Sequence, residues 1–227
     1  MATDSRHAAK RIKLDFSEEI TVLVGADEKR FMCHKAIICS HSKFFRAACS
    51  KGFKEGEEKL VRLPEVDADV FPRYLQWAYS GEVVVASAEE VATDRGMRLD
   101  LVQLYILAEY LADALLRNAI TDLLRTVYTV AETGPGAAVL CLAYQTTSDK
   151  CTLQKLMLGW HLGTSGIKYN VLGEWYDDHG QSLPVAFYMG MTIAMAKMIA
   201  QGAKAPAFAD AHKCAFHEHD EEVPACK

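Results

Sequence analysis

The sequence predicts an α+β fold, in which a small mixed sheet with short helices is followed by an all-helical extension. Three observations support this prediction. Short alternating or β-branched runs are confined to residues 20–86, as is typical of strands. From residue 69 onward, apolar residues recur three and four positions apart, which is the spacing of one helix face. Gly134, Pro135 and Gly136 then separate two helical parts, because neither residue type continues a helix.

The first strands are expected to form a hairpin. Residues 20–25 (ITVLVG) and 29–35 (KRFMCHK) are predicted as two strands joined by a turn near Gly25 and Asp27. Two short helices should follow, at residues 36–38 and 42–49.

The hydroxyls of Ser40 and Ser42 can accept hydrogen bonds from the amides of a first helical turn, which supports these two helices. Gly52 and Gly56 are then expected to interrupt the chain. Residues 59–63 (KLVRL) alternate apolar and basic side chains before Pro64, so they predict a third strand.

The next helix begins near residue 69, has Pro72 in its first turn and ends at Gly81. Residues 82–86 (EVVVA) predict a fourth strand. The polar residues 87–98 predict a mobile loop with Gly96 as its hinge.

Two amphipathic helices are predicted at residues 101–115 and 116–130, with Asp113 as the cap between them. Beyond the Gly-Pro-Gly triplet, further helices are expected at residues 137–144, 151–161 and 185–200, with a looser stretch at 163–182. Residues 183–200 are apolar, but they contain Lys197, which favours a buried helix over a membrane span.

These elements predict four parts of the chain. They are a polar N-terminal lead (1–19), a sheet-and-helix domain (20–131), a helical extension (137–204) and an acidic tail with Cys and His (205–227).

Composition excludes several classes of protein. Half of the residues are apolar, 24% are charged and the formal net charge is -5, so no basic field favours nucleic-acid binding, and no membrane partner is expected. The seven cysteines are odd in number and no apolar signal segment precedes them. The sequence therefore predicts free thiols in a reducing compartment, nuclear or cytoplasmic or both.

Several motifs in order resemble the signature of BTB/POZ domains. The signature positions are Phe31, His34, Lys35, Ser42, Phe44, Phe45 and Gly81. The match continues through Leu63-Pro64-Glu65, Tyr74-Leu75-Gln76-Trp77 and the run at 104–111. The details are most similar to fungal BTB proteins that carry a helical extension.

This resemblance implies a BTB/POZ fold and a structural role for His34, which lies at a strand-to-helix junction. It implies a protein-interaction scaffold that forms homodimers or heterodimers, with Phe71, Tyr74 and Tyr79 as candidate partner-surface residues. Some BTB domains also hold a cullin-type ubiquitin-ligase scaffold, so the alternative function is a substrate adaptor for such a ligase.

The N-terminal lead contains Lys10, Arg11 and Lys13, in a run that resembles a monopartite nuclear import signal. A solvated basic segment without function is the alternative.

The acidic tail carries the residue types that bind zinc, at Cys214, His217, His219 and Cys226. Two thiolates and two imidazoles can complete a tetrahedral shell, which would make the chain a zinc-binding nuclear regulatory protein. The alternative is an acidic tail without fixed structure, and no other cofactor is expected.

No motif of an enzyme is present. The sequence lacks a glycine-rich phosphate loop, a Gly-x-Ser-x-Gly elbow and a His-Glu-x-x-His zinc motif, so we expect no catalytic residues.

Overall fold

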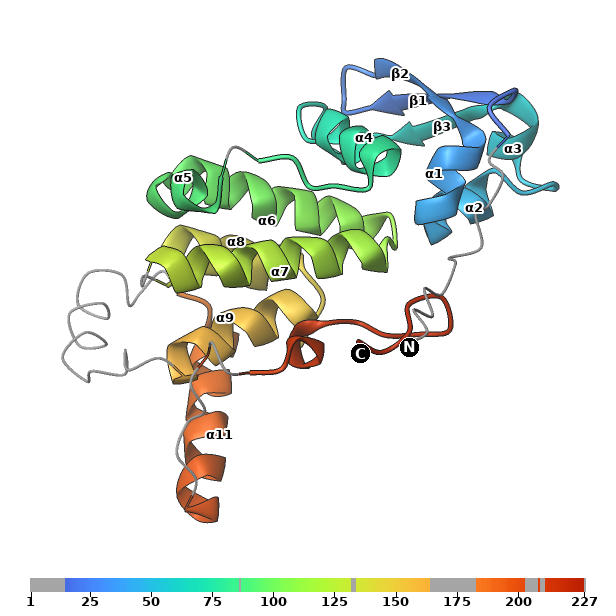
Figure 1. Ribbon diagram of the computed structural model, residues 1–227. Coiled ribbons are helices and arrows are strands. Elements are labelled where there is room, and N and C mark those ends of the chain that lie inside the picture. The colour runs from blue at the N-terminus through green and yellow to red at the C-terminus, as the bar shows by residue number, and fades with distance from the viewer. Residues whose placement is uncertain are drawn as a thin grey trace, which may run out of the picture. The chain divides into compact units, whose positions relative to one another are not determined.

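The computed structural model describes residues 15–85, 87–131, 134–163, 183–202, 208 and 211–226. The chain forms two compact units, which lie within residues 1–65 (the N-terminal unit) and 66–227 (the helical unit). The N-terminal unit holds the sheet, and the helical unit holds every helix from α4 onward that the structure describes (Figure 1). The predicted α+β fold is confirmed, whereas the predicted domain edge at residues 134–136 stays a prediction.

The sheet has three strands, β1 (Glu19–Val24), β2 (Lys29–His34) and β3 (Leu60–Leu63), in the order β2-β1-β3. β1 runs antiparallel to β2 and parallel to β3, so the sheet is mixed. Alternate side chains of β1, at Ile20, Val22 and Val24, are buried, as one covered face requires. The predicted hairpin and third strand are therefore confirmed.

Short helices accompany the sheet in the N-terminal unit. Ser42 ends α1 (Lys35–His41) and caps α2 (Lys43–Ala48), where its Oγ accepts a hydrogen bond from the Phe45 amide at 3.0 Å. The prediction that Gly56 interrupts the chain is wrong, because it lies inside α3 (Lys54–Glu58). A Cβ at residue 56 would come 2.6 Å from the Ser50 carbonyl oxygen, so close backbone approach requires glycine there.

The long helices of the helical unit follow the predicted spacing. α4 (Phe71–Ser80) has proline in its first turn and ends at Gly81, whose φ of 75° lies in the left-handed region that favours glycine. α6 (Arg95–Tyr110) and α7 (Ala114–Ala131) form the expected pair.

The predictions for residues 82–98 are wrong. The described part of the predicted fourth strand, residues 82–85, forms no strand, and the predicted mobile loop contains α5 (Ala88–Thr93) and the first turn of α6. The Ser87 Oγ accepts from the Glu90 amide at 3.1 Å, in a Ser-x-x-Glu pattern typical of helix starts. The Asp94 carboxylate accepts from the Gly96 and Met97 amides at 2.7 and 3.1 Å. Capping side chains thus convert a polar segment into two helix starts.

The remaining helices are α8 (Ala137–Thr146), α9 (Thr152–Gly163), α11 (Val185–Gln201) and the short η2 (Lys213–Phe216). α8 packs against α6, and α9 packs against α7, α8 and α11 (Figure 1). The predicted looser stretch lies, apart from residue 163, outside the described residues.

The prediction that residues 183–200 form a buried helix is wrong for most of the segment. Phe187 and Met191 are buried in α11, but Val185 is 75% exposed and Ile199 is 82% exposed. Among the described residues, no helix has the length and apolar character needed to cross a membrane.

A buried carboxylate joins α4 to the turn between α6 and α7. Asp113 is 0% exposed, and its Oδ2 accepts a hydrogen bond from the Trp77 indole nitrogen at 3.0 Å. Its Oδ1 accepts from the Leu116 amide at 2.9 Å, which confirms the predicted cap. One side chain therefore caps α7 and holds α4.

Replacing Asp113 with alanine should lower the free energy of unfolding by roughly 2–4 kcal/mol, because a cap is lost and a buried indole N–H loses an acceptor. Asp94→Ala is the matched control, since it removes an exposed cap alone and should cost about 1 kcal/mol. Urea denaturation of the full chain measures both values. Equal losses in the two variants would contradict the proposed importance of the buried contact.

Candidate functional site

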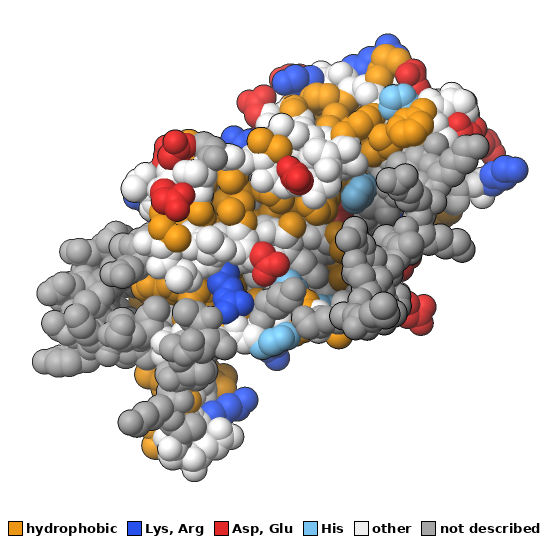
Figure 2. All heavy atoms as spheres, viewed as in Figure 1, with side chains coloured by type: hydrophobic (Ala, Val, Ile, Leu, Met, Phe, Trp, Pro, Cys, Tyr) orange, Lys and Arg blue, Asp and Glu red, His pale blue; other side chains and the backbone are white. Residues whose placement is uncertain are grey.

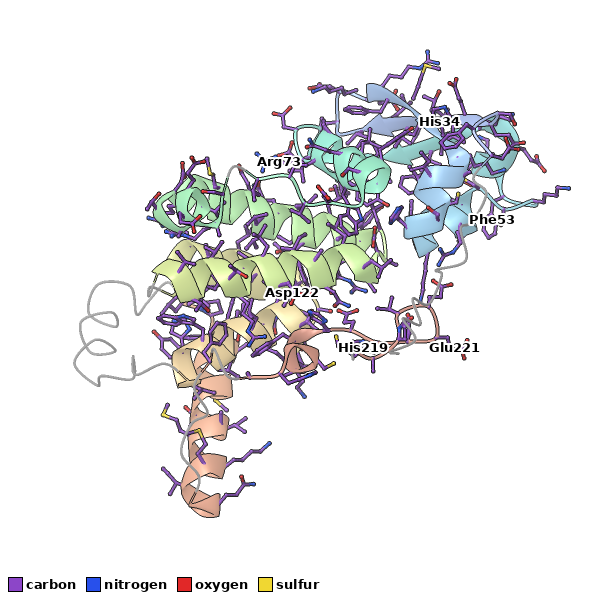
Figure 3. All side chains as sticks on the ribbon, in the orientation of Figure 1. His34, Phe53, Arg73, Asp122, His219 and Glu221 are labelled. Carbon is purple, nitrogen blue, oxygen red and sulfur yellow. The ribbon has the colours of Figure 1, made fainter. Side chains whose placement is uncertain are left out.

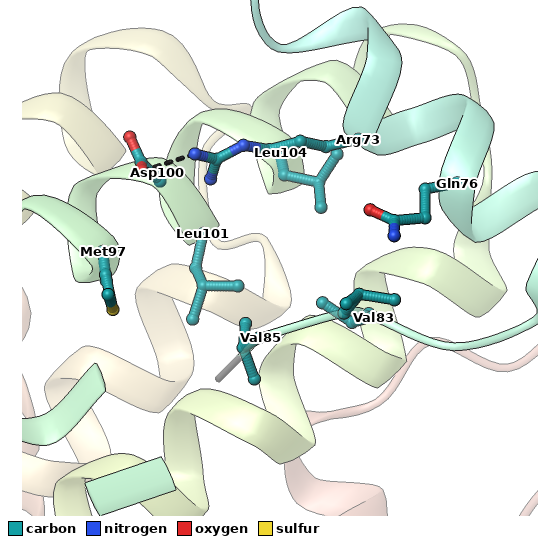
Figure 4. A pocket seen from close by; sticks show the side chains of 9 residues that line it. Arg73, Gln76, Val83, Val85, Met97, Asp100, Leu101 and Leu104 are labelled. Carbon is teal, nitrogen blue, oxygen red and sulfur yellow. Dashed lines mark hydrogen bonds and ion pairs between the residues drawn. The ribbon is translucent and has the colours of Figure 1, made fainter. Parts of the chain in front are cut away.

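A pocket of about 250 Å³ lies on the helical unit, between α4, α6 and the segment at residues 83–85. Apolar side chains from that segment and from Met97, Leu101 and Leu104 of α6 line it (Figure 4). The polar lining comes from Arg73, Gln76 and Asp100.

An ion pair closes one side of the pocket. The Arg73 guanidinium lies 2.7 Å from the Asp100 carboxylate, and the two side chains are 48% and 37% exposed (Figure 4). An exposed pair of this kind adds at most about 1 kcal/mol to stability. The pair places fixed charges of both signs beside an apolar surface. Since the pocket lining contains no Ser, Cys, His or Lys, it suits the binding of a side chain better than bond chemistry.

Two apolar side chains of this lining are also exposed. Val84 is 57% exposed and Met97 is 36% exposed, whereas Leu101 and Leu104 behind them are buried. Hydrophobic side chains also reach the surface over the part of the helical unit that holds α5 and α6 (Figure 2). Exposed apolar side chains next to charged groups are typical of a protein-interaction surface.

The prediction of three partner-surface residues is wrong for two of them, because they are buried. Phe71 and Tyr74 are 0% exposed, because they lie on the covered face of α4, so a role at the surface is wrong for both. Tyr79 is 48% exposed and stays a candidate. The sequence prediction missed Val84 and Met97, which it had assigned to a strand and a loop.

The signature residues occupy structural positions. His34 ends β2 and precedes α1, with its ring edge against Phe16 at a centroid distance of 5.4 Å. The Lys35 ammonium lies 3.0 Å from the Glu18 carboxylate, and this hydrogen bond raises the pKa of Lys35. In α2, the rings of Phe44 and Phe45 are in edge contact, with a centroid distance of 5.5 Å. Gly81 is the C-cap of α4. Phe31 is half-buried on β2.

The cysteines are all among the described residues, and no disulfide joins any of the seven. Burial raises the pKa of the Cys33 thiol to about 12, so this thiol stays protonated at neutral pH. A hydrogen bond between the Cys49 and Cys39 thiols raises the pKa of Cys49 and lowers that of Cys39. Neither Cys39 nor Cys49 is paired with a histidine in these contacts, whereas nucleophilic catalysis requires a base beside the thiol.

Three of the four C-terminal residues predicted to bind metal come together on the helical unit, and His217 lies outside this group. Ligand atoms of Cys214, His219 and Cys226 all lie within 4.8 Å of one another. The His217 Nδ1 lies 3.1 Å from the Cys226 Sγ, and its Nε2 lies 2.8 Å from the Asp122 carboxylate of α7. Figure 3 labels Asp122 on α7 and His219 in the C-terminal segment.

The predicted import signal, at Lys10, Arg11 and Lys13, lies outside the described residues and stays a prediction.

Comparison with known proteins gives a family for the first part of the chain. A model of the BTB/POZ domain matches residues 14–129, which is just over half of the 227 residues. Kelch-like protein 40 of Xenopus tropicalis is 31% identical over 72 residues, which are 32% of this chain and 12% of that protein. Kelch-like protein 24 of Homo sapiens is 30% identical over 66 residues, or 29% and 11% of the two chains.

Kelch repeat and BTB domain-containing protein 8 of Homo sapiens is 31% identical over 93 residues, which are 38% of this chain and 16% of that protein. The matched segment therefore spans less than a fifth of each of these relatives. The specific likeness to fungal proteins stays a prediction. The match to the domain model carries the assignment, and by it the chain belongs to the BTB/POZ domain family.

Proposed function

We propose that this chain is a protein-interaction scaffold and not an enzyme, and that it pairs through its BTB domain with a second copy of itself. The match of the BTB/POZ model over residues 14–129 is the observation that carries this proposal. The pocket on the helical unit supports it, because its lining offers apolar surface for contact and contains no Ser, Cys, His or Lys.

The pairing surface includes the pocket rim around Val84 and Met97. A stable protein interface removes roughly 1,600 Å² from water, and a few central apolar side chains supply most of the binding energy. Val84 is the most exposed apolar side chain of the pocket lining and can serve as such an anchor. Arg73 and Asp100 beside it add charges that set the orientation of a partner.

The full chain should sediment as a dimer at micromolar concentration, and Val84→Asp should weaken dimerisation at least about tenfold, because a carboxylate would be buried at an apolar contact. Sedimentation equilibrium over a concentration series measures the dissociation constant. Val130→Asp is the matched control, since Val130 on α7 is 46% exposed and lies away from the pocket lining.

The two possible failures are distinguishable. A wild-type chain that stays monomeric at high concentration contradicts homodimerisation itself. A dimer that responds equally to both valine substitutions retains the scaffold proposal and removes the pocket from it.

A second candidate is recruitment of a cullin, which the BTB resemblance implies for some family members. The exposure of Tyr79 at the last turn of α4 favours this candidate, because α4 carries the three candidate partner-surface residues that the BTB resemblance implies. Phe71 and Tyr74 are buried on the covered face of α4 and do not contact a partner directly.

Purified cullin should bind the full chain in a pull-down or by calorimetry, and Tyr79→Ala should weaken the complex about tenfold or more, as expected for an aromatic anchor. Tyr110→Ala is the matched control, because this tyrosine is 47% exposed at the end of α6. Absence of binding by a wild-type chain that still dimerises would eliminate the cullin candidate.

A further inference from the structure

The C-terminal segment at residues 211–226 packs on the helical unit through specific contacts. Phe216 and Val223 are buried, with 7% and 8% exposed surface. η2, which ends at Phe216, packs against α7 and α9. The Cβ of any side chain at position 159 of α9 would lie 3.0 Å from the Phe216 ring, so glycine there admits the phenylalanine.

Contacts with α7 fix the backbone between the two histidines of this segment. The Asn118 side chain accepts from the Glu218 amide at 2.8 Å and donates to the Glu218 carbonyl at 2.9 Å. The Arg117 guanidinium lies 2.6 Å from the Glu218 carboxylate, with side chains 15% and 30% exposed. Glu218, which lies between His217 and His219 in the sequence, is therefore held at three points.

A turn then brings the last cysteine back to the histidines. The Asp220 carboxylate accepts from the amides of Glu222 and Val223, each at 2.8 Å. The Asp220 amide donates to the Val223 carbonyl at 3.0 Å. Pro224 follows this turn, and the Cys226 Sγ comes to 3.9 Å from the His219 Nε2.

We propose that this segment binds one zinc ion through Cys214, His217, His219 and Cys226, and that the ion clamps the C-terminal segment to α7. Zinc lies about 2.3 Å from sulfur and 2.0–2.1 Å from nitrogen, so tetrahedral ligand atoms are about 3.4–3.8 Å apart. The observed separations from the Cys226 Sγ, 3.1 Å to His217 and 3.9 Å to His219, lie on both sides of this range. A small closing movement brings Cys214, His219 and Cys226 to this spacing, and His217 completes the shell by also approaching Cys214 and His219.

Asp122 gives His217 the orientation of a ligand. Its carboxylate lies 2.8 Å from the His217 Nε2, so that nitrogen carries the proton and donates it in a hydrogen bond. The Nδ1 lone pair then points toward the Cys226 sulfur, where the ion would bind. Zinc sites frequently contain a carboxylate that is hydrogen-bonded to a histidine ligand. The carboxylate fixes the orientation of the ring and makes it a better ligand.

The charges of the site also suit zinc. When the ion binds, the two thiols lose their protons to solvent and the two histidines bind as neutral rings. Two thiolates balance the charge of the divalent ion. The spacing of the two histidines is closer than in common zinc sites, and the anchoring of Glu218 between them provides the rigidity that this spacing requires.

The full chain, purified under reductant and equilibrated with zinc, should retain one zinc ion per chain after gel filtration, as measured by mass spectrometry of the metal. Cobalt in place of zinc should give the thiolate charge-transfer and tetrahedral d–d absorption bands. Cys214→Ser with Cys226→Ser should abolish both signals. Wild-type protein with only trace zinc, or a double variant that keeps stoichiometric zinc, would overturn the proposal.

Matched controls separate the site from adventitious binding. Cys141→Ser removes a thiol on α8, and Glu221→Gln removes an exposed carboxylate from the same segment (Figure 3). Both variants should keep zinc, and loss of zinc in either would contradict the assigned ligands.

Asp122→Asn tests the orienting contact without removing a ligand. It should keep the stoichiometry and weaken zinc affinity about 10- to 100-fold in a competition with a chelator. An unchanged affinity would contradict the role of His217 as a ligand oriented by Asp122.

The clamp predicts a local response to removal of the metal. A chelator should increase hydrogen exchange of the amides at residues 214–226, while exchange in β1 stays unchanged. Because this readout and zinc content do not depend on dimerisation, they stand apart from the tests of the scaffold. Unchanged protection of the segment would contradict a clamping role.

Discussion

A buried carboxylate at the start of α7 is the interaction on which the helical unit depends. Asp113 follows Ala112, whose φ of 53° places a non-glycine residue in the left-handed region and turns the chain sharply after α6. An unpaired charge in this position would be very costly, but the Trp77 indole and the Leu116 amide both donate to it. The tight turn therefore fixes α6 against α7, and the indole fixes α4 against both. Because Arg73 and Gln76 lie on α4, the same contact positions the polar side of the pocket.

The apolar side of the pocket results from a segment that has strand composition and no strand partner among the described residues. Val83, Val84 and Val85 lie against α6 instead of entering the sheet. Strand preference expresses how well a side chain fits a paired, half-buried surface, so it has little effect where no ladder is available. Val83 and Val85 are half-buried beside the pocket that they share with Leu101 and Leu104, and Val84 is exposed. The surface best suited to bind another protein is thus a by-product of an unpaired run of valines.

Features with a local signal could be predicted from the sequence, and features that depend on a distant partner could not. Proline in the first turn of α4, Gly81 at its end and Ser42 between two short helices act within a few residues, and each was predicted. The caps at Ser87 and Asp94 are equally local and were missed because polar composition was given more weight than spacing. The burial of Phe71 and Tyr74 also has a local signal, since they share one face of α4 with Ala78, whereas Tyr79 lies on the other face. The hydrogen bond from Trp77 to Asp113 joins residues 36 positions apart, so it has no local signal in the sequence.

The C-terminal segment shows the same limit most clearly. Cysteine and histidine in close succession indicate metal binding by residue type alone, so the four proposed ligands could be named from the sequence. Asp122 could not be named, because it lies 95 positions from His217 and is one acidic residue among many. The acidic composition of the segment favoured a tail without fixed structure, yet Glu218 and Asp220 make the contacts that order it. Composition averages over residues, whereas order here depends on whether each carboxylate meets a donor at the right place.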